Sequence, residues 1–143
     1  MVQSLIPNLM VADVSRSVAF YCELLDFELV MAVPEDSREV LFALPEGRRL
    51  VYALVKNGVA QLMFQEQASL RQDVPAFANS TPGAAVSFYM EQATKEELEA
   101  YAAKAATEAR IVKAPFDTWY GMRECYFTDP DGYVLCLACK LAE

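Results

Sequence analysis

The sequence predicts an α+β fold made of two tandem βαβββ modules, in which a helix covers one face of each curved mixed sheet. The order strand, helix and three strands occurs twice, and the second copy is displaced by roughly 80 residues. The chain has 143 residues, a length that suits one ordinary domain or two fused half-size modules. We expect a single domain over 1–143, with module one at 1–66, a linker at 67–82 and module two at 83–143.

The first module opens with a short apolar run over residues 4–11, followed by Asp13. Such a run is typical of a buried strand, and aspartate is a preferred helix N-cap. The next apolar side chains share one stripe of a 3.6-residue period, formed by Val14, Val18, Tyr21, Cys22 and Leu25. The sequence therefore predicts a helix that begins after Asp13 and packs on a sheet.

Short apolar runs separated by turn-forming residues follow this helix. They predict strands at 27–33, 40–44, 49–55 and 59–65. Asn57-Gly58, between the last two runs, is a strong signal for a two-residue hairpin. The segment 67–82 is polar, contains two prolines and has no sustained period, so we interpret it as a linker.

The second module repeats the pattern, with a predicted strand at 84–90 and a helix that opens at Thr94. Glu97 lies three residues later and completes a capping box. The buried stripe of this helix is Leu98, Tyr101, Ala102 and Ala105. Further strands are predicted at 110–113, 122–127 and 133–138. The last two are joined by Asp-Pro-Asp-Gly at 129–132, whose residue types suit a type I turn.

Composition and charge exclude several classes of function. Histidine is absent, which removes Ser-His-Asp and Cys-His nucleophile systems, imidazole bases and every metal site with a histidine ligand. The net charge of −8 repels nucleic acids and anionic membranes and favours cationic partners. The apolar runs are too short to span a bilayer, and the first ten residues lack signal-peptide features. We expect a cytoplasmic protein without nucleic-acid or membrane partners.

The four cysteines, at 22, 125, 136 and 139, lack the spacing of a secreted disulfide scaffold, so we expect free thiols. Cys136 and Cys139 form a C-x-x-C sequence inside an apolar run. A strand directs positions three apart to opposite faces, which favours a core strand over a zinc or redox site. Its apolar neighbours are expected to raise the pKa of Cys136 and to keep this thiol inert.

Two stretches of the chain resemble one protein family. The opening is LIPNLMVADVSRSVAFY at 5–21, continuing through 24–29, and the closing is YGMRE at 120–124 with DPDGY at 129–133. Both are similar to the glyoxalase/bleomycin-resistance/extradiol-dioxygenase family, also called the vicinal oxygen chelate superfamily. The resemblance implies βαβββ modules that form a curved, barrel-like mixed sheet, a cupped site, and commonly a homodimer. In the family's enzymes, the first and last strands of each module supply metal ligands, usually histidine, glutamate or glutamine.

The resemblance places those metal-ligand positions at Ile6, at Leu62 or Met63, at Ala84 and at Cys136. Gln61 and Gln65 are the only donors near the second position. A divalent metal of this kind needs three or four convergent oxygen or nitrogen donors, and at best one or two remain here. We therefore expect no metal, no cofactor and no catalytic residues, as in the family's metal-free branch.

A binding cup needs flat apolar surfaces and a few polar anchors. The predicted ligand-facing residues are Asn8, Met10, Phe64, Phe88, Trp119, Tyr120, Met122 and Arg123. The alternative interpretation of Phe64 and Phe88 is that they are core aromatics. Trp119 and Tyr120 stand beside Gly121, in a loop that the resemblance places at the mouth of the cavity.

Charged residues allow two interpretations in two places. Arg123 and Glu124 form either a ligand anchor or a structural cross-strand pair. An acidic loop either attracts a cation or is a solvated edge, and its carboxylates are Glu35, Asp36, Glu39 and Glu46.

These observations favour a metal-independent small-molecule-binding protein of this family. It would capture a cationic aromatic antibiotic or a related compound by stacking and by attraction to its negative charge. One alternative is a metal-dependent lyase, isomerase or dioxygenase with a non-standard site formed by Gln61 or Gln65, Glu124 and Cys136. The other is a structural dimer without a ligand.

Overall fold

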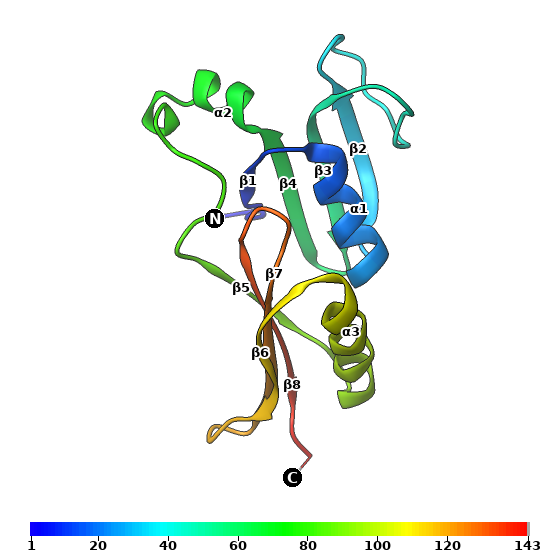
Figure 1. Cartoon of the computed structure of the whole chain (residues 1–143), viewed down its shortest axis with the longest axis vertical. Helices are drawn as coiled ribbons and strands as arrows, with labels where there is room; N and C mark the ends of the chain where they lie inside the picture. The colour runs from blue at the N-terminus through cyan, green and yellow to red at the C-terminus, as the bar shows by residue number, and fades with distance from the viewer. Residues whose placement is uncertain (143) are drawn as a thin grey trace. The chain divides into compact units, whose positions relative to one another are not determined.

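The computed structural model describes residues 1–142 and confirms the α+β fold with two βαβββ modules. The chain divides into two compact units, residues 1–83 and the residues from Ala84 onward. Each unit contains a four-stranded mixed sheet with a long helix on one face (Figure 1). Each sheet ends in two edge strands and is not by itself a closed barrel. Residue 143, the last of the predicted second module, lies outside the described residues.

The first unit has the strand order β1-β4-β3-β2, in which β1 runs parallel to β4 and the other neighbours are antiparallel. Its elements are β1 (Asn8–Val11), α1 (Val14–Leu25), β2 (Glu28–Pro34), β3 (Leu50–Asn57), β4 (Ala60–Glu66), α2 (Gln67–Asp73) and the 3-10 helix η1 (Pro75–Phe77).

Helix α1 begins and ends at specific side-chain contacts. Asp13 Oδ1 accepts a hydrogen bond from the backbone N–H of Arg16 at 3.1 Å, which confirms the predicted N-cap. At the other end Asp26 adopts a left-handed φ of 57°. Asn57 Nδ2 then donates to the carbonyl oxygen of Leu25 at 2.9 Å, so the end of β3 satisfies a carbonyl that the helix leaves open.

The predicted strand at 40–44 is wrong. The backbone of Leu41 exchanges hydrogen bonds of 2.8 Å with Ala32, and this contact is an isolated bridge. Phe42 and Leu44 are exposed, so little apolar burial holds this segment against the free edge of β2.

The predicted hairpin between β3 and β4 exists, but its turn lies one residue later than expected. Asn57 still pairs with Ala60, so the two turn residues are Gly58 and Val59. Gly58 has a φ of 56°, and glycine at the first central position suits a type II′ turn.

The segment 67–82, expected to be a linker, contains α2 and η1. Glu66 caps α2, because its Oε2 accepts from the backbone N–H groups of Ala68 at 3.0 Å and Ser69 at 3.2 Å. Leu70 is the buried anchor of the helix. A helix of 7 residues is too short to produce a periodic apolar signal.

The second unit has the strand order β5-β8-β7-β6, with β5 parallel to β8. Its elements are β5 (Ser87–Glu91), α3 (Lys95–Glu108), β6 (Arg110–Asp117), β7 (Met122–Thr128) and β8 (Val134–Lys140). No helix within residues 1–142 is both long and apolar enough to cross a membrane.

Two local predictions for the second unit are confirmed. Thr94 Oγ1 accepts from the backbone N–H of Glu97 at 3.1 Å and caps α3. The turn after β7 closes with Gly132 N–H donating to the Asp129 carbonyl at 3.1 Å, and the Asp129 carboxylate accepts from Tyr133 N–H at 3.0 Å. From the predicted stripe, α3 buries Leu98, Ala102 and Ala105.

Candidate functional site

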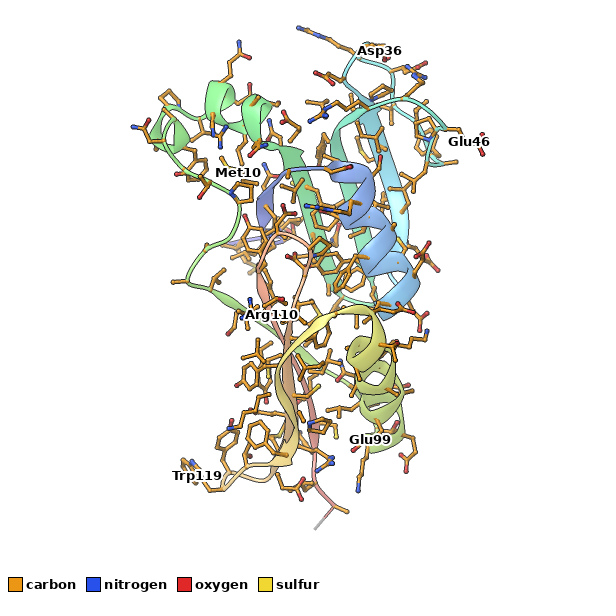
Figure 2. The ribbon with its side chains drawn as sticks, in the orientation of Figure 1. Met10, Asp36, Glu46, Glu99, Arg110 and Trp119 are labelled. Carbon is orange, nitrogen blue, oxygen red and sulfur yellow. The ribbon has the colours of Figure 1, made fainter. Side chains whose placement is uncertain are left out.

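The two faces of the second sheet have different surroundings. Arg123 on β7 reaches α3, where its guanidinium binds the carboxylate of Glu99. Successive strand residues point to opposite faces, so Glu124 points away from α3. Figure 2 shows Glu99 and Trp119 on opposite sides of the second unit. We call the face of this sheet that is turned away from α3 the open face.

On the open face, Glu124 accepts hydrogen bonds from three tyrosines. The Tyr120 hydroxyl lies 2.8 Å from Oε1 and 2.7 Å from Oε2. The Tyr89 hydroxyl donates to Oε2 at 3.1 Å, and the Tyr126 hydroxyl donates to Oε1 at 3.3 Å. The three tyrosines come from the β6–β7 turn, from β5 and from β7. We call these four residues the tyrosine–carboxylate cluster.

Glu124 is completely buried, with 0% of its surface exposed. A buried carboxylate is costly unless it is paired and hydrogen-bonded. Ion pairs among the described residues do not include Glu124, and its partners are the neutral phenols. The site is therefore a buried carboxylate whose described partners are neutral, and a carboxylate removed from water attracts a cation more strongly than a solvated one does.

The cluster keeps its phenols protonated. Burial, followed by the hydrogen bond to Glu124, raises the pKa of Tyr89 to about 12. The hydrogen bond to Glu124 is the main cause that raises the pKa of Tyr120. The pKa of Tyr126 is also raised, first by its hydrogen bond with Cys136 and then by burial. All three hydroxyls are therefore hydrogen-bond donors at neutral pH.

Cys136 lies beneath the cluster in the middle strand, β8. It pairs with Tyr89 on one side and with Tyr126 on the other, so these residues form one row across three strands. Burial raises the pKa of the Cys136 thiol, and its hydrogen bond with Tyr126 opposes this rise. Within residues 1–142 all cysteines are free, in agreement with the prediction.

The open face extends onto β6, where an aromatic ring already contacts a lysine ammonium. Phe116 pairs with Glu124 in the ladder, and its ring stacks with Tyr126 at a centroid distance of 6.4 Å. The ammonium of Lys113 lies 3.7 Å from the centre of the Phe116 ring, in a cation–π contact. This part of the sheet therefore combines a carboxylate with cation-binding rings.

The corresponding face of the first sheet carries amide and hydroxyl side chains at the equivalent positions. Tyr52 occupies the position on β3 that Glu124 occupies on β7. Asn8 Nδ2 donates to Gln65 Oε1 at 3.0 Å, and the Gln65 amide donates to Ser69 at 2.9 Å and to Asp73 at 2.7 Å. The amide of Gln65 is thus held by partners within the first unit.

The predicted ligand-facing residues of the first unit are split between its two faces. Asn8 and Met10 lie on the face turned away from α1, although Met10 is 5% exposed. Phe64 points toward α1, where its ring lies 5.2 Å from that of Tyr21, and it is completely buried. The expectation of ligand contact does not fit Phe64, because its side chain fills the core.

In the second unit, Trp119 and Tyr120 lie on the turn before β7 and Met122 lies on the open face. Arg123 binds Glu99 and Asp117 on the opposite face, so it is a structural bridge and not the partner of Glu124.

Phe88 also faces away from the cluster. It precedes Tyr89 on β5 and its ring lies 6.3 Å from that of Tyr133. The geometry therefore fits the core interpretation for Phe88, and the predicted residue that joins the cluster is Tyr120.

Tyr89 and Tyr126 were not among the predicted ligand-facing residues. Tyr126 follows Glu124 by two positions in a predicted strand, and this spacing signals a shared face. No local signal identifies Tyr89, because it reaches Glu124 only through the pairing of β5 with β8.

The acidic loop of the first unit is largely neutralised by arginines. Arg48 lies 3.0 Å from Asp36 and 2.7 Å from Glu39. Arg49 lies 3.2 Å from Glu35. Glu46 is exposed, as is Asp36, and Figure 2 shows both side chains at the edge of the unit. This arrangement fits a solvated edge.

The metal-ligand positions implied by the family do not fit a divalent metal. Ile6 and Ala84 have hydrocarbon side chains, and the register places Met63, not Leu62, on the face away from α1. Cys136 has a raised pKa, whereas a metal binds the thiolate. Within residues 1–142, no three His, Cys, Asp or Glu side chains are grouped to hold a metal ion.

Comparison with protein families identifies the fold. The model of the Glyoxalase/Bleomycin resistance protein/Dioxygenase superfamily matches residues 5–137. The chain belongs to this superfamily. The superfamily match spans both units, in agreement with the predicted family. None of the curated proteins compared with the chain matches it.

Solved structures share the superfamily fold across almost the whole chain. A glyoxalase/bleomycin resistance protein/dioxygenase family enzyme from Burkholderia phytofirmans PsJN has a TM-score of 0.73 at 20% identity, over 95% of this chain and 97% of that chain. Lactoylglutathione lyase from Agrobacterium tumefaciens has a TM-score of 0.64 at 19% identity, over 97% of this chain and 95% of that chain. A glyoxalase-related enzyme from Fulvimarina pelagi has a TM-score of 0.66 at 17% identity, over 97% of this chain and 89% of that chain. Identities this low show a common fold alone.

Proposed function

We propose that this superfamily member binds a small cationic aromatic molecule on the open face of its second sheet, without a metal and without changing a covalent bond. The observation that carries the proposal is Glu124, a fully buried carboxylate held by tyrosine hydroxyls and not by a lysine or arginine of the described chain. A ligand cation would supply the missing positive charge.

The surroundings of Glu124 support an aromatic cation. The stacked rings of Phe116 and Tyr126 lie beside the carboxylate, and the Lys113 ammonium over Phe116 shows that this ring accepts a cation. Trp119 and Tyr120 add a second pair of rings in edge contact at 5.3 Å. The net charge of −8 attracts cations over a longer range. Antibiotics of the bleomycin type are candidates for such a ligand.

Calorimetry in a buffer with a metal chelator tests the proposal. Bleomycin, phleomycin and simpler planar aromatic cations are titrated into the chain, and we expect one ligand per subunit. Glu124→Gln should weaken binding by about tenfold or more, because it removes the charge of a desolvated ion pair. Glu46→Gln removes the same charge from an exposed position and should leave the affinity almost unchanged. Equal effects of the two substitutions would refute a binding site at Glu124.

We infer that the protein forms a homodimer. Tyr89 on one edge strand is 52% exposed and Val112 on the other is 57% exposed, and a second copy would cover such apolar edges. Light scattering at micromolar concentration tests this state, and a monomeric mass would refute it.

The cytoplasm is the proposed location, because the four free cysteines suit a reducing compartment. Fractionation of cells that express the full chain tests it, and recovery outside the cytoplasm would refute it.

A further inference from the structure

Tyr120 covers Glu124 on the open face of the second sheet. Glu124 is 0% exposed, whereas Tyr120, which contacts both carboxylate oxygens, is 51% exposed. Tyr89 is similarly exposed, at 52%, so a molecule that arrives from solvent on this side meets the hydroxyls of Tyr120 and Tyr89 before it reaches the carboxylate.

Where the Tyr120 hydroxyl lies, the Glu124 carboxylate can accept hydrogen bonds from two donors. Tyr126 binds Oε1 and Tyr89 binds Oε2, so each oxygen retains one further acceptor site. Tyr120 has a single hydroxyl proton, which it shares between the two oxygens at 2.8 and 2.7 Å. A planar group with two parallel N–H bonds would satisfy both sites at once.

Tyr120 is also the partner that can leave most easily. Tyr89 and Tyr126 belong to strands β5 and β7, but Tyr120 lies in the short turn between β6 and β7. The backbone hydrogen bonds of this turn join Thr118 to Met122 and Gly121 to Leu141. Rotation of the Tyr120 side chain breaks none of them.

We propose that Tyr120 fills the place of a planar amidinium or guanidinium group, and that a ligand with such a group displaces Tyr120 from Glu124. This inference rests on the proposed function and names the chemical class of its ligand. Tyr120 thereby becomes a specificity-determining residue. A neutral hydrogen-bond donor does not displace its hydroxyl, whereas an amidinium or guanidinium group replaces the one shared proton with two charge-assisted hydrogen bonds.

Three small probes test the ligand class in calorimetry. Benzamidine carries a planar amidinium group, benzylamine carries the same ring with a compact ammonium group, and benzamide is planar but neutral. We expect benzamidine to bind about fivefold or more tightly than benzylamine, because only the amidinium group engages both oxygens, and benzamide not to bind.

Substitution of Tyr120 tests the displacement. Tyr120→Phe removes the hydroxyl that competes with the ligand, so benzamidine should bind about five- to tenfold more tightly, in line with the loss of one competing hydrogen bond. Tyr89→Phe removes a supporting donor and should not tighten binding. Tyr52→Phe, at the equivalent position of the first sheet, should leave the affinity unchanged.

Trp119 gives a second measurement that needs no substitution at Tyr120. It is the one tryptophan of the chain and its ring lies 5.3 Å from that of Tyr120. Displacement of Tyr120 should change the fluorescence of Trp119 with the same Kd as calorimetry. Binding without a fluorescence change would overturn the displacement, even where Tyr120→Phe fails to fold.

The remaining outcomes separate this inference from the proposed function. An unchanged or weaker affinity in a folded Tyr120→Phe variant overturns the inference. If benzamidine does not bind either protein while another cation binds in a Glu124-dependent manner, the ligand class is wrong and the proposed function stands. If no cation binds to wild type or to Tyr120→Phe, both fail.

Discussion

Tyr89 on β5 donates its hydroxyl to Glu124 on β7 at 3.1 Å, across the intervening strand β8. Cys136 of β8 lies between Tyr89 and Tyr126 in one row of the sheet, and Glu124 pairs with Ala138 in the adjacent row of the same face. The site therefore depends on the register of three strands. A shift of one residue in any of them would turn its side chain to the face covered by α3.

This contact predicts how stability depends on alkaline pH. The pKa of Tyr89 is raised to about 12, whereas the pKa of an unfolded tyrosine is ~10. The folded state thus holds the proton more tightly, so the contribution of Tyr89 to stability is complete below the unfolded pKa. It is lost as pH rises through the folded pKa. Difference spectra of phenolate absorbance between wild type and Tyr89→Phe measure the pKa.

Glu124→Gln checks the cause of that shift. Without the carboxylate charge, the pKa of Tyr89 should fall toward its ordinary value, although burial keeps it raised in part. A pKa for Tyr89 that is the same in both proteins would show that Glu124 has no effect on it.

Phe64 and Trp119 should respond in opposite ways to truncation. Phe64 is completely buried and Trp119 is 95% exposed. Phe64→Ala should lower the free energy of unfolding by about 3–5 kcal/mol, because it leaves a cavity. Trp119→Ala should change it by less than ~0.5 kcal/mol and should weaken ligand binding. Urea unfolding and calorimetry measure the two effects, and equal losses of stability would contradict the assigned positions.

The contact of Asn57 with α1 predicts a cost for its removal. Asn57→Ala deletes the donor to the Leu25 carbonyl and should lower the free energy of unfolding by about 1 kcal/mol. Lys56→Ala, at the preceding exposed position, is the matched control. A similar loss for both variants would mean that the hydrogen bond contributes nothing specific.

The cysteines should react slowly in the native protein. Burial raises the pKa of Cys125 to about 11 and also raises the pKa of Cys136 and of Cys139. Because the thiolate is the reactive form, a thiol reagent at neutral pH should modify at most the half-buried Cys22, and all 4 cysteines after unfolding. Rapid native labelling that Cys136→Ser abolishes would contradict this.

Divalent metals should not stabilise the chain specifically. On the open face of the second sheet the register places Glu91, Glu124 and Cys136, but no three such side chains of residues 1–142 are grouped to hold a metal, and Glu124 already binds three tyrosines. Melting temperatures with nickel, manganese, iron and zinc should match those with chelator. A large rise with one metal that Glu124→Gln abolishes would favour the lyase or dioxygenase alternative.

The sequence was sufficient for features that depend on a few neighbouring residues. Asp13 and Thr94 cap helices through backbone groups three residues away, and the turn at 129–132 closes on itself. The doubled order of elements followed from such local patterns, whereas the family was indicated by the resemblance of the stretches at 5–29 and 120–133 to its motifs. The prediction of a strand at 40–44 was wrong because an apolar run becomes a strand only where a neighbouring strand pairs with it, and this segment makes only an isolated bridge.

The site was only partly accessible from the sequence, because its hydrogen bonds join residues that are distant in the chain. Tyr89 and Glu124 are separated by 35 positions and meet through the parallel pairing of β5 with β8. Strand register also decides that Phe64 and Arg123 point to the faces covered by helices, and that Tyr120 contacts the carboxylate of Glu124. Apolar periodicity specifies which elements form, whereas a cluster of polar side chains exists only once those elements pair in one register.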